Sequence, residues 1–441
     1  MINKHVKTHT DVVCPFCGSL CDDLEVDVVN DEVVEVRNAC KIGTQIYFSS
    51  NSDNSDRYTS PMIRKDGELH PATWEEALEK AATLLANAKR PLLYGWSSTE
   101  AEAIQLGVEL AEITGGILDN CSSICHGPSI MAMQDAGIPK STLGDYKNRA
   151  DLVIFWGCNP VHAHPRHLGR YSEFIRGYFR KDGLNDRFMV VIDPRTTHTA
   201  QLADLHIKVN PSEDYELFSA LRTVLKGIEL EEEYVSGIPR EQIEQLVEVM
   251  KSCNYGVIYY GLGLTHSLSH HRNVENAICL TRELNDHTKF LIQPMRGHYN
   301  VAGSNIVFSW NTGYPLAIDF SRGYPRYNPG EYSVVPALLR DEIDVTIVVA
   351  SDPVLNFPAA AVENMLKHPL ISVEPHETPT SALADVVLPV KICGVEAEGT
   401  AYRMDNVPIR LRKVKDGPNG LLTDREIMKR LINAIKQKKN L

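Results

Sequence analysis

Cys14-Pro15-Phe16-Cys17-Gly18-Ser19-Leu20-Cys21 is the stretch that decides the organisation of this chain, and Cys40 completes it. The spacing C-x2-C-x3-C-x18-C places three thiols on one short loop and a fourth on a later segment. Three close thiolates and one distant thiolate are typical of proteins that hold an iron–sulfur cluster. Structural zinc is the alternative, although zinc more often takes its thiolates from paired CxxC knuckles. The pattern therefore favours a [4Fe–4S] cluster bound by Cys14, Cys17, Cys21 and Cys40.

Composition narrows the class of protein. The chain has 441 residues, more than one hydrophobic core usually holds, so we expect several domains. Its 45 basic and 57 acidic residues give a net charge of −12, which argues against nucleic acid or an anionic membrane surface as the main partner. No apolar run approaches the roughly 20 residues that span a bilayer. The polar N-terminus lacks a secretion signal, so we expect a reducing, cytoplasmic location.

After the cysteine loop, the sequence predicts a hairpin and then a long alternation of strands and helices. Leu24–Val29 and Val33–Val36 alternate apolar and polar residues around an Asn-Asp turn. Strands are expected at Pro91–Gly95, Leu152–Gly157, Phe188–Asp193, Gly256–Gly261, Phe290–Gln293, Val345–Ser351 and Leu370–Glu374. Continuous apolar strands between helices indicate parallel sheets covered on both faces. The predicted fold class is α/β, a small [4Fe–4S] module plus two doubly wound, Rossmann-like domains.

Polar residues follow four of these strands. Ligands of open α/β sheets bind outside the carboxyl ends of the strands, where Gly admits a phosphate and Asn, Asp or Thr offer hydrogen bonds. The strand ends are Gly157-Cys158-Asn159-Pro160, Asp193-Pro194-Arg195-Thr196, Tyr260-Gly261-Leu262-Gly263 and Ala350-Ser351-Asp352-Pro353. Together they predict an extended ligand that carries a nucleotide. The chain has neither a GxGxxG after a strand nor a Walker A sequence, which disfavours plain NAD or ATP.

Two loops carry reactive side chains. Cys125-His126 presents a thiolate and an imidazole together, either as a metal ligand beside a proton acceptor or as a nucleophile beside its base. The alternative is a buried cysteine next to a capping histidine. In Met295–Asn300, Arg296 can bind a carboxylate as a fork and His298 can relay a proton, whereas a surface ion pair is the alternative for Arg296.

These features together resemble the molybdopterin oxidoreductase superfamily, which includes formate dehydrogenases and dimethyl sulfoxide reductase. The resemblance covers nearly the whole chain, and the cysteine module comes first, as in the family. The other motifs that carry it are Asp56–Pro61, Trp74–Ala77, Gly157–Pro160 with His164-Pro165, Asp193–Thr197, Asp214, Glu377–Pro389 and Glu396–Thr400. One departure is Cys40-Lys41-Ile42-Gly43, where the family has Cys-x-Lys-Gly, so the family's lysine role is not carried over to Lys41.

The resemblance implies a [4Fe–4S] cluster and tungsten or molybdenum held by two molybdopterin guanine dinucleotides. It makes Cys125 the protein ligand of that metal, and His126, Arg296 and His298 further catalytic residues. The cofactor-binding residues that it implies are Gly157, Asn159, Asp193, Arg195, Thr197, Asp214, Gly261, Gly263, Ser351, Asp352, Thr378 and Asp385. It also implies a module at 1–60 together with 391–441, an α/β domain at 61–119 plus 301–390, and a second α/β domain inserted at 120–300.

The activity that the resemblance implies is reversible reduction of CO2 to formate with electrons from the cluster. Formate would then be condensed with methanofuran by a partner, the first step of methanogenesis from CO2. The chain ends without the C-terminal β-barrel domain of larger members, which implies a small β-barrel subunit beside an amidohydrolase-like subunit and ferredoxin-type iron–sulfur subunits. The alternatives are a formate dehydrogenase catalytic subunit and a cofactor-free scaffold such as those in formyltransferase/hydrolase complexes.

Overall fold

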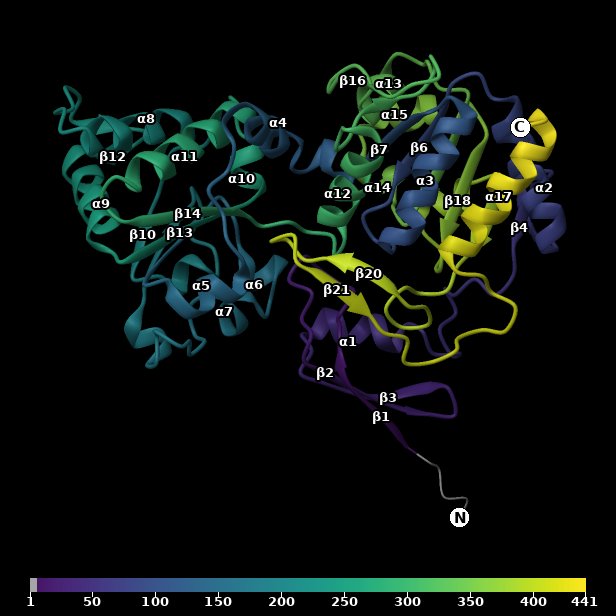
Figure 1. Cartoon of the computed structure of the whole chain (residues 1–441), viewed down its shortest axis with the longest axis horizontal. Coiled ribbons are helices and arrows are strands. Elements are labelled where there is room, and N and C mark those ends of the chain that lie inside the picture. Colours follow the sequence, from purple (N-terminus) through teal and green to yellow (C-terminus); the bar gives the residue numbers. More distant parts are fainter. Residues whose placement is uncertain (1–5) are drawn as a thin grey trace. The chain divides into compact units, whose positions relative to one another are not determined.

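The computed structural model describes residues 6–441, which form two compact units (Figure 1). The larger unit contains the chain up to Ile124, His298–Arg403 and Pro408–Leu441, and the smaller contains Cys125–Gly297 and Met404–Val407. The sequence predicts the inserted segment at 120–300. No helix within residues 6–441 has both the length and the apolar character needed to cross a membrane.

The cysteine module lies at the start of the larger unit. Strands β1 (Lys7–Val12), β2 (Leu24–Val29) and β3 (Glu32–Arg37) form an antiparallel sheet, so the predicted hairpin is confirmed. Helix α1 (Lys41–Phe48) begins directly after Cys40, whose sulfur accepts a hydrogen bond from the Gly43 N–H as the N-cap. The hairpin therefore delivers Cys40 to the side of the module where the loop with the other three cysteines lies.

A nine-stranded sheet forms the centre of the larger unit, in the order β16-β15-β7-β6-β17-β18-β19-β4-β5. Its strands are β4 (Met62–Lys65), β5 (Glu68–Pro71), β6 (Pro91–Gly95), β7 (Ile117–Asn120), β15 (Ile318–Asp319), β16 (Arg326–Tyr327), β17 (Val345–Val349), β18 (Leu370–Glu374) and β19 (Val386–Pro389). The five central strands, in the spatial order β7-β6-β17-β18-β19, are parallel to one another. The outer strands β16, β15, β4 and β5 pair antiparallel. The parallel strands are buried on both faces, which explains their continuous apolar runs.

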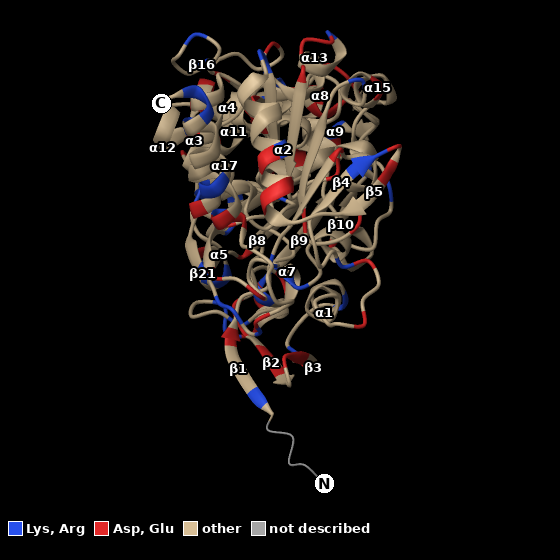
Figure 2. Ribbon diagram, turned by 90° about the vertical axis from the view of Figure 1, so that its right-hand side faces the viewer, with Lys and Arg blue, Asp and Glu red and all other residues tan. Residues whose placement is uncertain are grey.

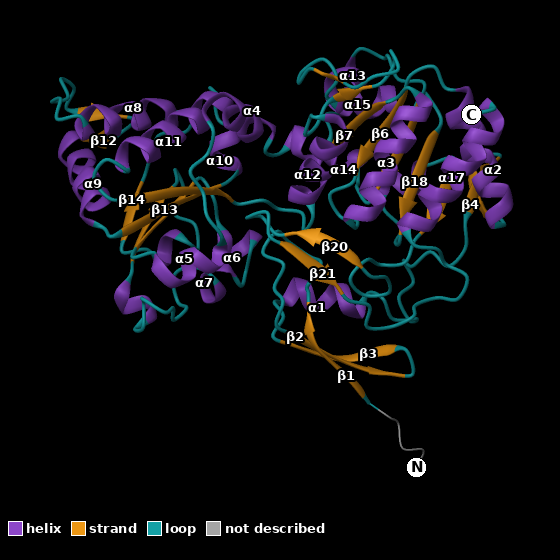
Figure 3. Ribbon diagram, in the orientation of Figure 1, coloured by secondary structure: helices purple, strands orange, loops and turns teal. Residues whose placement is uncertain are grey.

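Helices cover both faces of this sheet (Figure 3). Because successive strand residues point to opposite faces, Leu93 and Ile347 contact one helical layer, and Leu92 and Val348 contact the other. The first layer contains α2 (Trp74–Asn87), α3 (Ala101–Thr114), α12 (Val301–Thr312) and α17 (Asp424–Lys439), and the second contains α13 (Val334–Leu339) and α15 (Ala359–Met365). The short η1 (Cys121–Ile124), α14 (Pro353–Asn356) and α16 (Pro379–Leu383) follow strand ends.

The C-terminal segment divides between two cores. The hairpin of β20 (Gly399–Tyr402) and β21 (Pro408–Leu411) and the residues beside it pack against the cysteine module. Helix α17 instead packs on α2 and α3, because its apolar side is continuous with the core of the nine-stranded sheet. The predicted association of the whole of 391–441 with the module therefore does not extend to α17. Thr423 and Glu426 form a capping box at the start of this helix.

The smaller unit is a five-stranded parallel sheet with the order β10-β9-β8-β13-β14. Its strands are β8 (Leu152–Trp156), β9 (Phe188–Ile192), β10 (Leu205–Ile207), β13 (Tyr255–Tyr260) and β14 (Lys289–Pro294), with a separate pair of β11 (Tyr234–Val235) and β12 (Ile238–Pro239). Its helices are α4 (Gly127–Ala136), α5 (Leu143–Arg149), α6 (Pro160–Ala163), α7 (His167–Arg170), η2 (Gly183–Asp186), η3 (Ala200–Leu202), α8 (Asp214–Leu225), α9 (Arg240–Ser252), α10 (Leu262–Thr265) and α11 (His271–Leu284). α4, α8, α9 and α11 cover one face, and α5, α7 and η3 cover the other. The α/β class with parallel sheets is thus confirmed.

The distribution of charged residues follows the layers of the fold. Figure 2 shows acidic and basic residues along α2, α17 and the outer strands β4 and β5. The central strands β8 and β9 of the smaller sheet carry no charged residue and are almost wholly buried. Charged side chains near the carboxyl ends of the parallel strands are therefore exceptions to the pattern, and such exceptions are where ligand sites are sought.

Candidate active site and cofactor pocket

The four predicted cluster ligands lie together in the cysteine module. Cys14, Cys17 and Cys21 are buried, Cys40 is half-buried, and the Cys14 N–H donates to the Cys21 carbonyl at 2.8 Å. Burial and then the neighbouring thiols of Cys21 and Cys17 raise the pKa of Cys14 well above its usual range. Gathered thiols that raise the pKa of a neighbour are a strong site for a cation, because ligation removes the protons that burial otherwise retains.

Gly43 keeps space free beside these sulfurs. A Cβ at this position would lie 2.9 Å from the Cys14 sulfur and 3.5 Å from the Cys40 sulfur. All ten cysteines are free of disulfides. Within residues 6–441, no three His, Cys, Asp or Glu side chains are arranged to hold one metal ion. The donor set of four thiols and the space kept by Gly43 fit an iron–sulfur cluster, and its presence stays a prediction.

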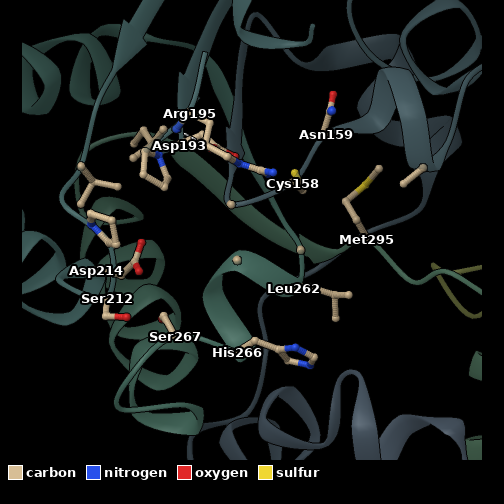
Figure 4. Close-up of a pocket in the computed structure, with 18 of the residues that line it drawn as sticks. Cys158, Asn159, Asp193, Arg195, Ser212, Asp214, Leu262, His266, Ser267 and Met295 are labelled. Atoms are coloured by element: carbon tan, nitrogen blue, oxygen red, sulfur yellow. Dashed lines mark hydrogen bonds and ion pairs between the residues drawn. The ribbon is translucent and has the colours of Figure 1, made fainter. Parts of the chain in front are cut away.

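A cavity of about 510 Å³ opens in the smaller unit beyond the carboxyl ends of its strands (Figure 4). It contains most of the residues that the sequence assigns to this sheet. The lining residues that the sequence predicts are Cys125, His126, Gly157, Asn159, Asp193, Arg195, Asp214, Gly261 and Gly263. Thr197 is outside the lining, and its hydroxyl instead accepts the Ala200 N–H at 3.1 Å.

Two glycine turns form the floor of this cavity. The Gly263 N–H donates to the Gly157 carbonyl at 2.9 Å, which joins the turns after β8 and β13. A Cβ on Gly263 would lie 2.6 Å from the Gly157 Cα, and a Cβ on Gly261 would lie 2.6 Å from the Cys158 Cβ. Gly157 also has a φ of +57°, which favours glycine. Only glycine fits at this crossing, and the exposed backbone is open to a close-fitting ligand.

One acidic side chain, Asp214, stands on one wall of the cavity. Asp214, the first residue of α8, accepts a hydrogen bond from the Trp156 indole N–H at 2.8 Å through Oδ1. Burial raises the pKa of Asp214, and the bonds from Trp156 and Ser267 oppose that shift. Figure 4 shows Asp214 and Ser267 on the same side of the cavity. Such a fixed, buried carboxylate can accept two N–H bonds from the edge of a purine.

Asp193 and Arg195 lie next to each other in the cavity lining, above Asp214 in the view of Figure 4. The Asp193 carboxylate accepts the Arg195 N–H at 2.9 Å and lies 3.5 Å from the Arg195 Nε. The Arg195 side chain is 78% exposed, so its guanidinium remains available to an anionic ligand. Asn159 is oriented by Thr199, whose hydroxyl donates to its Oδ1 at 2.5 Å.

His126 is buried beneath Cys125 in a defined protonation state. Its Nε2 is 3.2 Å from the Met295 carbonyl and its Nδ1 is 3.0 Å from the Ser129 hydroxyl. A carbonyl only accepts, so Nε2 carries the hydrogen and Nδ1 accepts from Ser129. Burial, and next the positive charge of Arg296, lower the pKa of His126 to about 3. The imidazole is therefore neutral, and the Thr265 hydroxyl fixes the neighbouring Cys125 carbonyl at 3.0 Å.

The Arg296 side chain is buried in the smaller unit, whereas His298 is exposed in the larger. Burial lowers the pKa of Arg296, and Tyr260 and Cys125 oppose that shift. His298 instead forms a β-bridge with Cys17. The structure thus brings Cys125, His126 and Arg296 into one unit and places His298 with the cysteine module.

His164 is a site residue that the sequence reasoning missed. It is 3% exposed, and its Nε2 lies 2.7 Å from the Arg296 carbonyl, which accepts its hydrogen. His164 therefore fixes the backbone of the loop that carries Arg296. The signal in the sequence was its place just after Asn159-Pro160, in His164-Pro165, which is one of the motifs that carry the family resemblance.

The four predicted cofactor residues of the larger unit are not gathered in the same way. Asp352 accepts from both the backbone N–H and the hydroxyl of Thr380, and Thr378 caps α16. Asp385 accepts the Leu370 N–H at 2.9 Å, at the start of β18. Ser351 follows the opposite, carboxyl end of β17. Three of the four side chains therefore support the fold, and their predicted cofactor contacts remain untested.

Comparison with known proteins connects this geometry to a family. The family model described as molybdopterin oxidoreductase matches residues 57–434. The chain is 52% identical over 434 residues to one subunit of the tungsten-containing formylmethanofuran dehydrogenase 2 of Methanocaldococcus jannaschii, covering 98% of this chain and 99% of that one. The same subunit in Methanococcus maripaludis is 52% identical over 431 residues, covering 97% and 99%. A chain of the formyltransferase/hydrolase complex of Methylorubrum extorquens shares the fold, with a TM-score of 0.70 at 20% identity over 87% of this chain and all of that one.

Proposed function

The chain belongs to the molybdopterin oxidoreductase family, and from this premise we propose that it is the catalytic redox subunit of a formylmethanofuran dehydrogenase complex. Its reaction is reversible reduction of CO2 to formate, which a partner condenses with methanofuran. The observation that carries the proposal is one cavity lined both by Cys125-His126 and by Asp214, Asp193 and the glycine turns. A metal ligand and a nucleotide site in one cavity are what a pterin dinucleotide enzyme requires.

Distinct residues would hold each cofactor. Cys125 would bind tungsten or molybdenum, and the relatives' names favour tungsten. The glycine turns and Asp214 would hold one of two pterin guanine dinucleotides, with Asp214 on the guanine edge. Cys14, Cys17, Cys21 and Cys40 would hold the [4Fe–4S] cluster. When bound, the metal with its pterin sulfurs supplies two-electron chemistry between CO2 and formate, and the cluster supplies one-electron transfer.

The side chains around Cys125 bind and orient the substrate. Arg296 offers a buried cation whose attraction for a carboxylate is strengthened by the low dielectric around it. His126 is neutral, with Nε2–H directed to Met295 and Nδ1 directed to Ser129. To exchange a proton with substrate, His126 must give up one of these two bonds. Its first role here is therefore to position the Cys125 loop against the Met295 backbone.

The relatives are each named as one subunit of a larger enzyme, which supports a multi-subunit complex. We propose the partners expected from the sequence, a small β-barrel subunit, an amidohydrolase-like subunit and ferredoxin-type iron–sulfur subunits. A formate dehydrogenase subunit would use the same cavity without a methanofuran partner. A scaffold, suggested by the fold shared with the formyltransferase/hydrolase complex, has no need for Cys125-His126 or for four gathered thiols. The cytoplasmic location stays a prediction.

The test begins with metal and pterin analysis of the native complex purified without air. We expect about four iron per chain, together with tungsten or molybdenum and a guanine dinucleotide pterin. Cys125→Ala is then expected to lower CO2 reduction by about tenfold or more while the complex and its iron remain. Cys279→Ala, which changes a half-buried thiol on α11, is the matched control. Unchanged CO2 reduction in Cys125→Ala would overturn the proposal, and absence of iron and pterin would point to a scaffold.

A further inference from the structure

Two carboxyl groups are buried side by side in the larger unit, away from the cavity described above. Glu100 precedes α3 and is 1% exposed, and Asp424 begins α17 and is 4% exposed. Burial, and next the charge of Glu100, raise the pKa of Asp424 well above its usual range. The Thr99 hydroxyl donates to the Glu100 Oε2 at 3.0 Å and is itself fully buried. Because neighbouring carboxylates repel each other in a dry interior, such a pair favours the retention of a proton.

Three oxygens of this region lack hydrogen-bond partners anywhere in residues 6–441. They are the Glu100 Oε1, the Asp424 Oδ1 and the Tyr299 hydroxyl. Tyr299 is 4% exposed, and the charges that act on its phenol are those of Cys393, Glu100 and Asp424, so it lies near the carboxyl pair. A buried polar atom without a partner costs free energy, and several gathered together indicate a place for a proton or ordered water.

The pair lies behind the cysteine module. Tyr299 and Cys393 pack in one apolar cluster with Val13 and Leu20, the residues next to Cys14 and Cys21. His298, directly before Tyr299, bridges to Cys17. A charge added at the four thiols therefore acts on Glu100 and Asp424 through a dry interior, where screening by water is weak.

A partly exposed cation lies beside the pair. The Arg425 Nε lies 3.8 Å from the Glu100 Oε1, and the Arg425 side chain is 38% exposed. Beyond Asp424, the buried Glu374 is the next carboxyl group, and its Oε1 accepts the Ser351 N–H at 2.5 Å.

We propose that Glu100 and Asp424 form a proton-loading site that takes up one proton from solvent when the cysteine-bound cluster accepts one electron. The inference rests on the proposed function, because it needs a cluster at Cys14, Cys17, Cys21 and Cys40. In the balanced step, the oxidised cluster takes up one electron and a carboxylate takes up one proton. The products are the reduced cluster and a carboxylic acid. An iron–sulfur partner subunit supplies the electron, and the proton leaves again on reoxidation.

The surrounding titratable groups favour uptake at this pair. Burial raises the pKa of both Glu100 and Asp424, and Arg425 is the cation that opposes the shift at Glu100. The other groups that face the pair are the Cys393 thiol and the Tyr299 phenol, whose pKa values burial raises well above their usual range, and Glu374, whose neighbours are Asp424 and Asp352. The thiol and the phenol stay neutral, so the carboxyl groups are the ones that exchange a proton.

The experiment is a redox titration of the cluster by electron paramagnetic resonance, at several pH values, in the complex purified without air. One proton per electron means that a tenfold change in proton activity changes the ratio of reduced to oxidised cluster by about tenfold. We expect this dependence in the unmodified complex and its loss in Glu100→Gln and in Asp424→Asn. Glu109→Gln is the matched control, because Glu109 pairs with Lys436 between the same two helices, α3 and α17, at the half-exposed surface.

The outcomes separate the inference from the proposed function. A reducible cluster whose titration is independent of pH in the unmodified complex overturns the inference alone, and so does an unchanged pH dependence in both variants. This first result needs no variant, so a failure of Glu100→Gln to fold does not prevent the test. Absence of a reducible cluster refutes the proposed function and the inference with it. Redox-difference infrared spectra give the second readout, a protonated carboxyl band that appears on reduction and is missing in Asp424→Asn.

Discussion

Arg57 and Glu396 form an ion pair in the larger unit, and both side chains are buried. The Arg57 Nη2 lies 2.5 Å from the Glu396 Oε2, and the two side chains are 3% and 0% exposed. The Arg57 Nη2 also donates to the Val390 carbonyl at 3.0 Å, and the Ile392 N–H donates to the Glu396 Oε2 at 2.9 Å. Removal of Arg57 leaves a buried carboxylate without its cation, and losses of this kind cost about 3–5 kcal/mol.

We therefore expect Arg57→Met to lower the free energy of unfolding by about 3–5 kcal/mol. For a unit of this size, the Tm should fall by roughly 6–20 °C. The double variant Arg57→Met/Glu396→Met removes both charges, and we expect it to recover most of the loss, because apolar replacement of a whole buried pair is often neutral. Thermal unfolding followed by circular dichroism at pH 7 measures each Tm.

The control for the effect of burial is an exposed ion pair between Arg410 and Glu398, which stands two residues after Glu396. The Arg410 Nη2 is 2.7 Å from the Glu398 Oε2, but these side chains are 74% and 54% exposed. Arg410→Met should therefore cost less than about 1 kcal/mol. A loss from Arg57→Met no larger than that from Arg410→Met would refute the argument that burial sets the cost. A double variant as unstable as Arg57→Met alone would refute the argument that the stranded charge is responsible.

Three further changes follow from the structure. Burial raises the pKa of Glu173 to about 7 from 4.5, so the free energy of unfolding should fall as pH rises through this interval. Denaturant titrations from about pH 4 to 8 measure this fall, and Glu173→Gln should remove it. Gly43→Ala should lower the iron content per chain, because its Cβ would lie 2.9 Å from the Cys14 sulfur, whereas Gly169→Ala, which meets nothing within 4 Å, should leave the iron unchanged. Asp214→Ala should lower the guanine dinucleotide content of the purified complex without loss of iron, and full retention of the dinucleotide would contradict its role at the guanine edge.

Local patterns were sufficient for much of the fold. The bounds of β2 and β18 and the capping boxes at Thr73 and Thr423 follow from alternation and from side chains three residues apart. The convergence of three of the four predicted strand ends on one cavity follows from the rule that the parallel strands of one sheet end at the same edge. These are short-range or directional rules, so one sequence is enough to apply them.

Other features depend on pairings that no local pattern encodes. Arg57 meets Glu396 across 339 positions of sequence, so two separate motifs of the family resemblance prove to be bonded to each other. The tautomer of His126 is set by the Met295 carbonyl, which lies 169 positions away. The Met295–Asn300 loop is divided, with Arg296 in one unit and His298 in the other. This division depends on the adjacent residues Met295 and Tyr299, which pack in different hydrophobic cores.

Asp214 and Asp385 show what separates a candidate ligand residue from a structural one. Both are aspartates in family motifs, and both have an oxygen held by an N–H donor. The donor to Asp214 is a side chain at the carboxyl end of β8, so the carboxylate stays at the edge where the cavity opens. The donor to Asp385 is the backbone of Leu370 at the amino end of β18, where the carboxylate links the starts of the neighbouring parallel strands β18 and β19. The end of the sheet at which each aspartate stands therefore distinguishes Asp214, which lines the cavity, from Asp385, whose carboxylate is bonded to the backbone of a neighbouring strand.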